Sequence, residues 1–298
     1  MLSILIPTYN YNVYPLVLEL KEQADYLGIE YEILVQDDAS FSKLNTKNQN
    51  INTIKNCFFF INNYNLGRGK NLNSLVAKAK FEWVLFLDCD TFPTQKNFIK
   101  KYISATGKNY SIVFGGIVYE NKQPEKKALL RWFYGQKREA LSVSNRNKNQ
   151  AYSALTSNLL IKKEILEKYP FDDSIKKYGY EDLCFFTILN ANNFKVTHIQ
   201  NPAYHLALET SDLFLKKTRT ALENLVFLER SNKLSVKESK IIAAQQKLEN
   251  LKLTTSVAFI FSKARAKIES NLLSGNPSLF WFDIYKLGYY CHLKSLNQ

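Results

Sequence analysis

The chain has 298 residues, of which 46% are apolar and 22% are charged. This length suits one large domain, or one domain with an extension, and the apolar fraction is ample for a core. Lysine and arginine number 40 against 27 aspartates and glutamates, so the formal net charge is +13. That excess favours an anionic partner such as a nucleotide diphosphate, a lipid surface or a nucleic acid, and charge alone does not choose among them.

Composition also argues against several classes of protein. The four cysteines are far apart and form no C-x-x-C pair, which disfavours a zinc site or a disulfide framework and favours reduced thiols in a cytosol. Residues 1–6 contain no basic segment and meet Pro7 too early for a signal peptide. No apolar run approaches the roughly 20 residues needed to cross a bilayer. We expect a cytoplasmic protein, with any membrane contact peripheral on the inner face of the plasma membrane.

The first part of the chain alternates strands with helices. Short apolar runs that end in polar residues predict strands at Leu2–Ile6, Tyr31–Val35, Cys57–Ile61 and Trp83–Leu87. Helical spacing of apolar residues predicts one helix over 13–27 and another after the polar loop 62–70. This order indicates an α/β fold with a mostly parallel sheet, whose polar strand ends gather on one rim.

The stretch 81–93 reads F-E-W-V-L-F-L-D-C-D-T-F-P and is the chemical centre of the sequence. Its apolar run suits a strand buried on both faces and ends in Asp88 and Asp90. Because strand side chains alternate, the two carboxylates are expected to converge while Cys89 faces away. Two hard oxygen donors suit Mg²⁺ or Mn²⁺, and α/β sheets bind ligands at their strand ends. The pattern therefore predicts a metal–diphosphate site.

The remainder of the chain divides near His205. Before it, strands are predicted at 112–119, 155–161 and 195–199, short helices at 162–168 and 183–189, and a loop-rich basic stretch at 121–150. Beyond it the apolar spacing is helical throughout, with a capping box at Ser235 and Glu238. We expect a first domain over 1–205 and a helical extension over 206–298. Its aromatic last segment, Leu279–Leu293, suits a membrane interface and equally suits packing against the core.

Four motifs occur in order in the first part: S-I-L-I-P-T-Y-N from Ser3, E-I-L-V-Q-D-D-A-S from Glu32, N-L-G-R-G-K from Asn65 and F-L-D-C-D from Phe86. Together they make the chain resemble a bacterial family 2 glycosyltransferase over about residues 2–205. The resemblance implies the GT-A fold, an α/β, Rossmann-like mixed sheet flanked by helices, followed here by the helical extension. It also implies Mn²⁺ or Mg²⁺ as cofactor.

The resemblance implies roles for residues at matching positions. Asp90 matches the direct metal ligand, Asp88 the acidic residue near the ribose and the metal, and Asp38 the carboxylate that accepts a hydrogen bond from the base. The other expected donor-binding residues are Pro7, Thr8, Tyr9, Asn10, Arg68 and Lys70. Relatives carry an Arg-Asn pair where this chain has Leu72-Asn73, so Arg68 is the candidate to replace the missing arginine.

Glu181 and Asp182 form a second acidic pair, before an apolar helical segment. An acidic first helical turn is by itself explained by the helix dipole. The family places a general base beside the acceptor here, which implies Asp182 as base and Glu181 as an acceptor-positioning residue. One base suffices because a metal-held diphosphate leaves without an acid, whereas glycosidases need two carboxylates. Some GT-A enzymes add a late histidine to the metal, which makes His205 a further candidate ligand.

These features predict an inverting enzyme that moves sugar from a nucleotide-sugar, expected to be a UDP-sugar, to a glycan or lipid-linked acceptor in cell-surface polysaccharide synthesis. No nucleic-acid partner is expected. Two alternatives stay open. A haloacid-dehalogenase-type phosphatase also uses an apolar strand with D-x-D, but needs Thr or Val two residues after the second Asp, where this chain has Phe92. A non-catalytic basic binder of glycans or nucleic acid lacks the RNA-module motifs, and its acidic rim would repel phosphates without metal.

Overall fold

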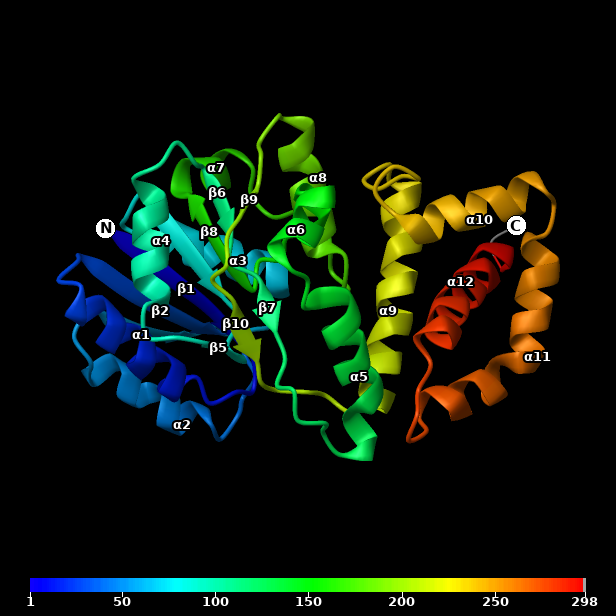
Figure 1. The fold of residues 1–298 in the computed structure, drawn as a ribbon, viewed down its shortest axis with the longest axis horizontal. Helices are drawn as coiled ribbons and strands as arrows, with labels where there is room; N and C mark the ends of the chain where they lie inside the picture. Colours follow the sequence, from blue (N-terminus) through cyan, green and yellow to red (C-terminus); the bar gives the residue numbers. More distant parts are fainter. Residues whose placement is uncertain (297–298) are drawn as a thin grey trace. The chain divides into compact units, whose positions relative to one another are not determined.

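The computed structural model describes residues 1–296, which form two compact units (Figure 1). The first unit comprises residues 1–120, 139–176 and 188–207, and the second comprises residues 121–138, 177–187 and the chain from 208 onward. The division at residues 205 and 206 stays a prediction. The two compact units differ from it, because residues 121–138 and 177–187 belong to the helical unit.

The first unit is built on a seven-stranded mixed sheet in the order β3-β2-β1-β4-β8-β6-β9, and it has a smaller sheet in the order β5-β10-β7. The first four strands of the large sheet are parallel, whereas β8 runs antiparallel to both of its neighbours. The strands are β1 (Leu2–Thr8), β2 (Tyr31–Asp37), β3 (Cys57–Ile61), β4 (Trp83–Leu87), β5 (Thr91–Pro93), β6 (Ile112–Phe114), β7 (Ile117–Val118), β8 (Asn158–Lys162), β9 (Thr197–His198) and β10 (Ala203–His205).

Crossover handedness decides which face of this sheet each helix covers. Because β2 and β3 lie on one side of β1 and β4 on the other, right-handed crossovers put α1 (Tyr14–Tyr26) and α3 (Arg68–Lys78) on opposite faces. α4 (Phe98–Thr106) packs beside α1, and α7 (Lys163–Lys168) packs beside α3. The short helices α2 (Asn45–Asn48) and α6 (Val143–Arg146) complete the unit.

The central strands explain why their sequence is continuously apolar. β1, β2 and β4 are buried along their whole length, as expected for strands covered on both faces. On one face Ile4, Ile33 and Leu85 belong to the core with α1 and α4. On the other face Phe86 meets Phe171 edge to face, with ring centroids 6.0 Å apart. This core holds the carboxyl ends of the three strands side by side, which positions the site described below.

The second unit is helical. Its rings form a shared cluster in which Tyr134, Phe214 and Phe282 contact one another in pairs at 5.3–5.6 Å. The helical spacing predicted beyond His205 is confirmed, because the apolar residues that share one face of a helix are buried: Leu215, Leu222, Leu225 and Leu228. The helices are α5 (Leu129–Tyr134), α8 (Glu181–Ala191, whose first turns lie in this unit), α9 (Ser211–Arg230), α10 (Lys240–Asn250), α11 (Thr254–Leu272) and α12 (Leu279–Ser295).

The aromatic segment near the C-terminus forms α12 and packs inside this unit. Phe282, Tyr285 and Tyr290 are buried, whereas Phe280 and Trp281 are exposed at its beginning. Over residues 1–296, the structure contains no helix that combines the length and apolarity required to span a bilayer.

Three local predictions need correction. The strand predicted over 112–119 is broken into β6 and β7, which lie in different sheets. The break falls at Gly115-Gly116, where a Cβ on Gly115 would lie 2.3 Å from the Asn201 carbonyl oxygen and one on Gly116 would lie 2.9 Å from the Arg146 guanidinium. A buried arginine therefore occupies the space that side chains of a continuous strand would need.

The other two corrections concern helices. Ser235 and Glu238 do bond to each other as a capping box does, but they close a separate turn, and α10 begins at Lys240 with Ser239 as its N-cap. The stretch 121–150 contains α5, a π-helical turn over 135–139 and α6, where loops were predicted. Its apolar side chains, such as the buried Leu129 and Leu130, are too few and too closely grouped for a periodic signal.

Candidate active site

Asp88 and Asp90 lie at the carboxyl end of β4, but strand alternation is not what brings them together. β4 ends at Leu87, and residues 88–91 form a turn in which the Thr91 amide and hydroxyl both donate to the Asp88 carbonyl, at 3.0 and 2.8 Å. Both carboxylates are one-quarter exposed. The turn, and not the pleat, therefore points the two acids outward at the strand end.

His205 reaches Asp90 through the small sheet. β5 continues from the turn, and its antiparallel pairing with β10 places His205 opposite Thr91. The Leu206 amide donates to the Asp90 carbonyl at 2.9 Å, which locks this register. His205 Nε2 then lies 3.5 Å from Asp90 Oδ2, and the His205 ring stacks on Tyr119 with centroids 5.3 Å apart. The sequence candidate His205 is thus brought beside Asp90.

Electrostatics around Asp90 resist two negative charges in one place. Burial raises the pKa of the Asp90 carboxyl above its usual range, and the Asp88 charge raises it further, while His205 and Arg68 act in the opposite direction. The same surroundings raise the pKa of Tyr11, mainly through burial and then through the negative charge of Asp90. A bound cation would relieve this repulsion, because it supplies the positive charge that the two acids lack.

Arg68 supplies part of that charge in the structure. Its Nη2 lies 2.9 Å from Asp88 Oδ1 and donates to Thr156 Oγ1 at 2.8 Å. Arg68 is the first residue of α3, after Gly67, whose φ of 82° is a conformation that glycine adopts without strain. The N-L-G-R-G-K loop therefore delivers its arginine to the first carboxylate. Lys70 points elsewhere, with its Nζ 3.9 Å from the exposed Asp173.

Asp38, the predicted base-binding carboxylate, organises the same loop. It is buried, and it accepts hydrogen bonds from the amides of Leu66 and Gly67 at 2.8 and 2.9 Å and from Asn62 Nδ2 at 2.8 Å. Asp37 instead accepts from the backbone amide and hydroxyl of Ser40, as a turn-stabilising carboxylate does. Asp38 therefore joins the end of β2 to the loop that carries Arg68, and its contact with a base stays a prediction.

The P-T-Y-N segment ends β1 beside these residues. Pro7 and Thr8 pair with Gln36 and Asp37 across the sheet, so they share the rim with Asp38. Tyr9 is 58% exposed, which leaves its ring accessible to a ligand. Asn10 adopts a left-handed conformation, and its Oδ1 accepts from the Ser42 hydroxyl at 2.6 Å. The first unit thus gathers the predicted donor-binding residues from the ends of β1, β2 and β4 and the start of α3.

Glu181 and Asp182 lie in the second unit, in the first turn of α8. Glu181 accepts from the Gly179 amide at 2.8 Å. The bend before the helix needs Gly179, whose φ is 105° and whose Cβ would lie 2.4 Å from that of Ala221. Asn224 holds the same bend by donating to the carbonyls of Lys177 and Gly179. The pair therefore begins a helix whose N-terminal bend is fixed by α9.

The residues at the end of β4 fit a divalent cation that a ligand completes. His205 Nδ1 is a buried atom without a hydrogen-bond partner among residues 1–296, and the equally buried Asp88 Oδ1 has the ion pair with Arg68 but no hydrogen bond of good geometry in the same part of the chain. In the same part of the chain, no group of three His, Cys, Asp or Glu side chains could hold a metal by itself. Mg²⁺ characteristically takes one or two carboxylates and fills its shell with water and substrate phosphates. The two carboxylates are ligands that suit Mg²⁺ and Mn²⁺ alike.

Sequence reasoning missed residues that the fold adds. Thr156 anchors Arg68, Tyr119 stacks on His205, and Tyr11 lies near Asp90. Tyr11 directly follows the first motif and was within reach of motif reasoning. Thr156 and Tyr119 had no local signal, because only the antiparallel β8 and the small sheet bring them to the site.

A surface hollow elsewhere on the first unit is lined by Leu18, Lys21, Glu22, Asp25 and residues 53–55. It lies at the opposite rim of the sheet, since Asp25 accepts a hydrogen bond from Tyr31, which begins β2. No residue of the site above lines it. This hollow is therefore separate from the strand-end site, which is identified by its chemistry.

Comparison with known proteins decides the family. The model of glycosyl transferase family 2 matches residues 3–170, which cover the four motifs and the end of β4. The chain belongs to glycosyl transferase family 2. This confirms the resemblance to a glycosyltransferase and decides against the dehalogenase-type phosphatase and the non-catalytic binder. A search of curated protein sequences finds no match.

Solved structures confirm the GT-A fold expected for this family 2 enzyme. A Pyrobaculum calidifontis mannosyltransferase, in complex with GDP-Man and Mn²⁺, is 14% identical over 99% of this chain and 86% of its own, with a TM-score of 0.59. Residues 1–349 of TarS from S. aureus, in complex with UDP-GlcNAc, are 18% identical over 100% of this chain and 91% of that one, with a TM-score of 0.52. In the longer TarS chain, the match spans only 38% of the length.

Proposed function

We propose that this family 2 glycosyltransferase is an inverting, metal-dependent enzyme that transfers sugar from a nucleotide-sugar to a glycan or lipid-linked acceptor. The observation that carries the proposal is the group formed by Asp88, Asp90 and His205 at the end of β4, with Arg68 ion-paired to it. Acids that lie together with a partly buried imidazole and too few hydrogen-bond donors are suited to a cation.

Each residue at this site has a definable task. Asp90 and His205 would hold Mn²⁺ or Mg²⁺, with Asp88 beside the ribose and the metal. The cation, when bound, neutralises the charge that develops on the departing diphosphate. Arg68 is the nearest cationic side chain for the same phosphates. If the Arg68 side chain moved from Asp88 to the phosphates of the entering donor, it would compensate their negative charge.

The donor is proposed to lie across the ends of β1, β2 and β4. Pro7, Thr8, Tyr9 and Asn10 would line the base and ribose pocket, and Asp38 would contact the base. Lys70, whose Nζ lies 3.9 Å from Asp173 in the structure, would have to turn away from it to contact the diphosphate. The solved relatives bind either GDP-Man or UDP-GlcNAc. A UDP-sugar remains the proposed donor, since the family's aspartate at the position of Asp38 commonly contacts uracil.

Asp182 is proposed as the general base, with Glu181 positioning the acceptor. Asp182 takes the proton of an acceptor hydroxyl while the hydroxyl oxygen forms a bond to the anomeric carbon. The bond from that carbon to the diphosphate oxygen breaks on the opposite face, so the configuration inverts and the nucleoside diphosphate leaves with the electron pair. The assignment rests on the Glu-Asp pair at the start of α8. A cytoplasmic enzyme of cell-surface polysaccharide synthesis is the setting that we propose.

A thermal-shift screen of UDP-, GDP- and dTDP-sugars, each with and without Mn²⁺, tests the donor and the metal together. A ligand that binds the folded protein stabilises it by mass action and so raises its melting temperature. At a ligand concentration of a hundred times Kd, the free energy of unfolding increases by about 2.7 kcal/mol. We expect a UDP-sugar with Mn²⁺ to give the largest rise, and the Asp90→Asn variant to lose the metal-dependent part. A rise that is equal with and without Mn²⁺ for every donor would contradict the metal site.

A further inference from the structure

The outer face of α11 and the corner that precedes it carry positive charge and no exposed acid. Between residues 247 and 270, the exposed charged side chains are all lysines: Lys247, Lys252, Lys263 and Lys267. None of the four forms an ion pair within residues 1–296. Elsewhere many lysines are neutralised, as Lys96 is by Glu19 and Lys294 by Glu229. This surface therefore presents uncompensated positive charge.

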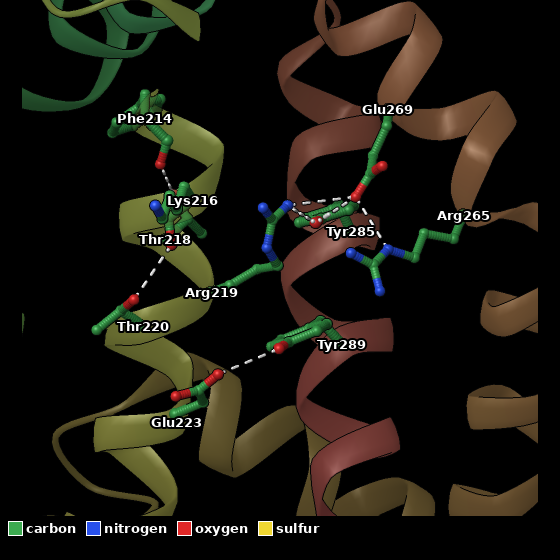
Figure 2. Close-up of polar contacts among 10 residues, drawn as sticks. All are labelled: Phe214, Lys216, Thr218, Arg219, Thr220, Glu223, Arg265, Glu269, Tyr285 and Tyr289. Carbon is green, nitrogen blue, oxygen red and sulfur yellow. Dashed lines mark hydrogen bonds and ion pairs between the residues drawn. The ribbon is translucent and has the colours of Figure 1, made fainter. Parts of the chain in front are cut away.

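The acids of the same segment are turned away from that surface. Glu269 accepts from Arg265 at 2.9 Å and from Tyr285 at 2.7 Å, on the side of α11 that faces α12 (Figure 2). Arg219 of α9 reaches the same oxygen at 3.4 Å. Glu249 is partly buried and accepts from Gln245. These inward contacts hold α11 in one orientation and leave its outer face without a carboxylate.

Large apolar side chains lie among these lysines. Phe259 and Ile260 on the outer face of α11 are each 64% exposed, and Leu251 and Leu253 at the corner between α10 and α11 are 66% and 43% exposed. Lys263 lies over the Phe259 ring with its Nζ 5.6 Å from the centroid. Scattered apolar residues are ordinary on protein surfaces, but four in ten residues of sequence, surrounded by unpaired lysines, form a patch.

We infer that this basic–apolar patch, formed by Leu251, Leu253, Phe259, Ile260 and the four lysines, docks the enzyme on an anionic lipid bilayer. Helices that lie in a membrane interface insert aromatic and aliphatic side chains below the headgroups while their lysines contact lipid phosphates. Lysines that lie close to an anionic leaflet strengthen the attraction of the protein to that leaflet. A soluble polyanion would use the lysines but would gain nothing from the four apolar side chains. Charge complementarity and apolar exposure together favour a bilayer.

This inference differs from docking through α12. That helix contributes Phe282, Tyr285 and Tyr290 to the core of the second unit, so its aromatic character is already explained by packing. Deleting α12 would therefore damage the fold and could not report on binding. Substitutions on the exposed face of α11 leave the core and the Glu269 contacts in place.

Flotation of the full-length protein with vesicles tests the inference. We expect binding to phosphatidylcholine vesicles that contain about 30% phosphatidylglycerol, and little binding to phosphatidylcholine alone. The double variant Lys263→Gln/Lys267→Gln should lower the partition coefficient on the order of 25-fold, because each lysine near an anionic surface contributes on the order of fivefold. Phe259→Ser/Ile260→Ser should lower it at least as much, with an unchanged melting temperature.

Two control variants and one further measurement make the outcome decisive. Tyr26→Ser removes a 90% exposed ring from α1 of the first unit, and it should float like the wild type. Loss of binding in Phe280→Ser/Trp281→Ser but not in Phe259→Ser/Ile260→Ser would assign the contact to α12 and overturn the inference. So would a concentration-dependent dimer in light scattering that Phe259→Ser/Ile260→Ser dissolves while no variant floats, because the patch would then join two copies of the chain.

Discussion

Asp90 in the first unit and Glu269 in the second are both partly buried acids, and they differ in their partners. Glu269 is contacted by Arg265, Tyr285 and Arg219 (Figure 2). Among residues 1–296, the Asp90 carboxylate forms an ion pair with His205 alone, at 3.5 Å, and Asp88 forms one with Arg68 alone. The side-chain hydrogen bonds of Glu269 lower the pKa of its carboxyl, although burial acts against them, whereas burial beside Asp88 raises that of Asp90. A satisfied acid stabilises a fold, and an under-satisfied pair of acids is available to a ligand.

The largest expected effect comes from breaking the under-satisfied site. Asp90→Ala should abolish metal-dependent transfer, a loss of roughly 10³-fold or more, because a cation contributes several kcal/mol to the transition state. The protein should remain folded, since Asp90 makes few contacts that stabilise it. Steady-state kinetics and Mn²⁺ binding by electron paramagnetic resonance measure the two parts. Glu22→Gln, at the opposite rim of the sheet, is the control, and equal losses in both variants would contradict the assignment.

Asp182→Asn tests whether the acids of α8 behave like Asp90 or like Glu269. A general base contributes typically 10²- to 10⁴-fold, so transfer should slow by that range while donor binding is preserved. Stopped-flow measurements with a fluorescent donor would separate donor binding from transfer. Asp212→Asn removes an acid from the first turn of α9 and provides a matched comparison for helix-dipole effects. Transfer at the wild-type rate in the Asp182 variant would refute its role.

The satisfied acid should respond in the opposite way. Glu269→Ala leaves Arg219, Arg265 and Tyr285 without their shared acceptor and should lower the free energy of unfolding by about 1–3 kcal/mol. Donor binding in the first unit should be unchanged. Urea denaturation followed by circular dichroism measures the loss, and the exposed Glu125→Ala in the same unit should show none. An Asp90→Ala variant that lost as much stability would remove the distinction between the two acids.

Arg68 supplies the counter-charge that Asp88 has in the structure. Arg68→Met should raise the affinity for Mn²⁺ alone by roughly 3- to 10-fold, since an ion pair at a partly exposed site is worth about 1 kcal/mol. It should weaken binding of UDP in the presence of Mn²⁺. Isothermal titration calorimetry gives both constants. If metal affinity falls in the variant, Arg68 does not compete with the cation.

The smallest effect concerns pH and a residue outside the site. His198 is buried against Phe114, and its Nε2 lies 2.9 Å from the Gln150 carbonyl oxygen. Burial lowers the pKa of His198 below 6.5, and the charge of Arg146 acts in the same direction. The unfolded chain therefore takes the proton first, so this part of the stability is complete above about pH 6.5 and is lost as the pH falls toward the lower folded pKa. Melting temperatures between pH 7.5 and 5.5 should decline less in His198→Gln, and parallel declines would contradict this.

Much of the first unit was predictable because its signals are local. The apolar runs of β3 and β4 begin and end as expected. The helices predicted after β1 and after the loop 62–70 are present, although the second begins at Arg68, inside the predicted loop. α4 was not predicted, although Phe98, Ile99, Tyr102 and Ala105 do have helical spacing. The break at Gly115-Gly116 was not predictable, because it depends on an arginine some thirty residues further along the chain. Long-range packing overrides a local apolar run in such places.

Motifs and periodicity are properties of neighbouring residues, so they were enough to predict the family, the order of strands and helices along the first part of the chain, and the acids at the end of β4. The surroundings of those acids depend instead on contacts between distant parts of the chain. The turn at 88–91 aims them, the pairing of β10 with β5 brings His205 to Asp90, and β8 brings Thr156 to Arg68. The outward lysines of α11 also acquire meaning only in the fold, since Glu269 and Glu249 are turned inward. Contacts between distant segments depend on the whole core, which no short stretch encodes.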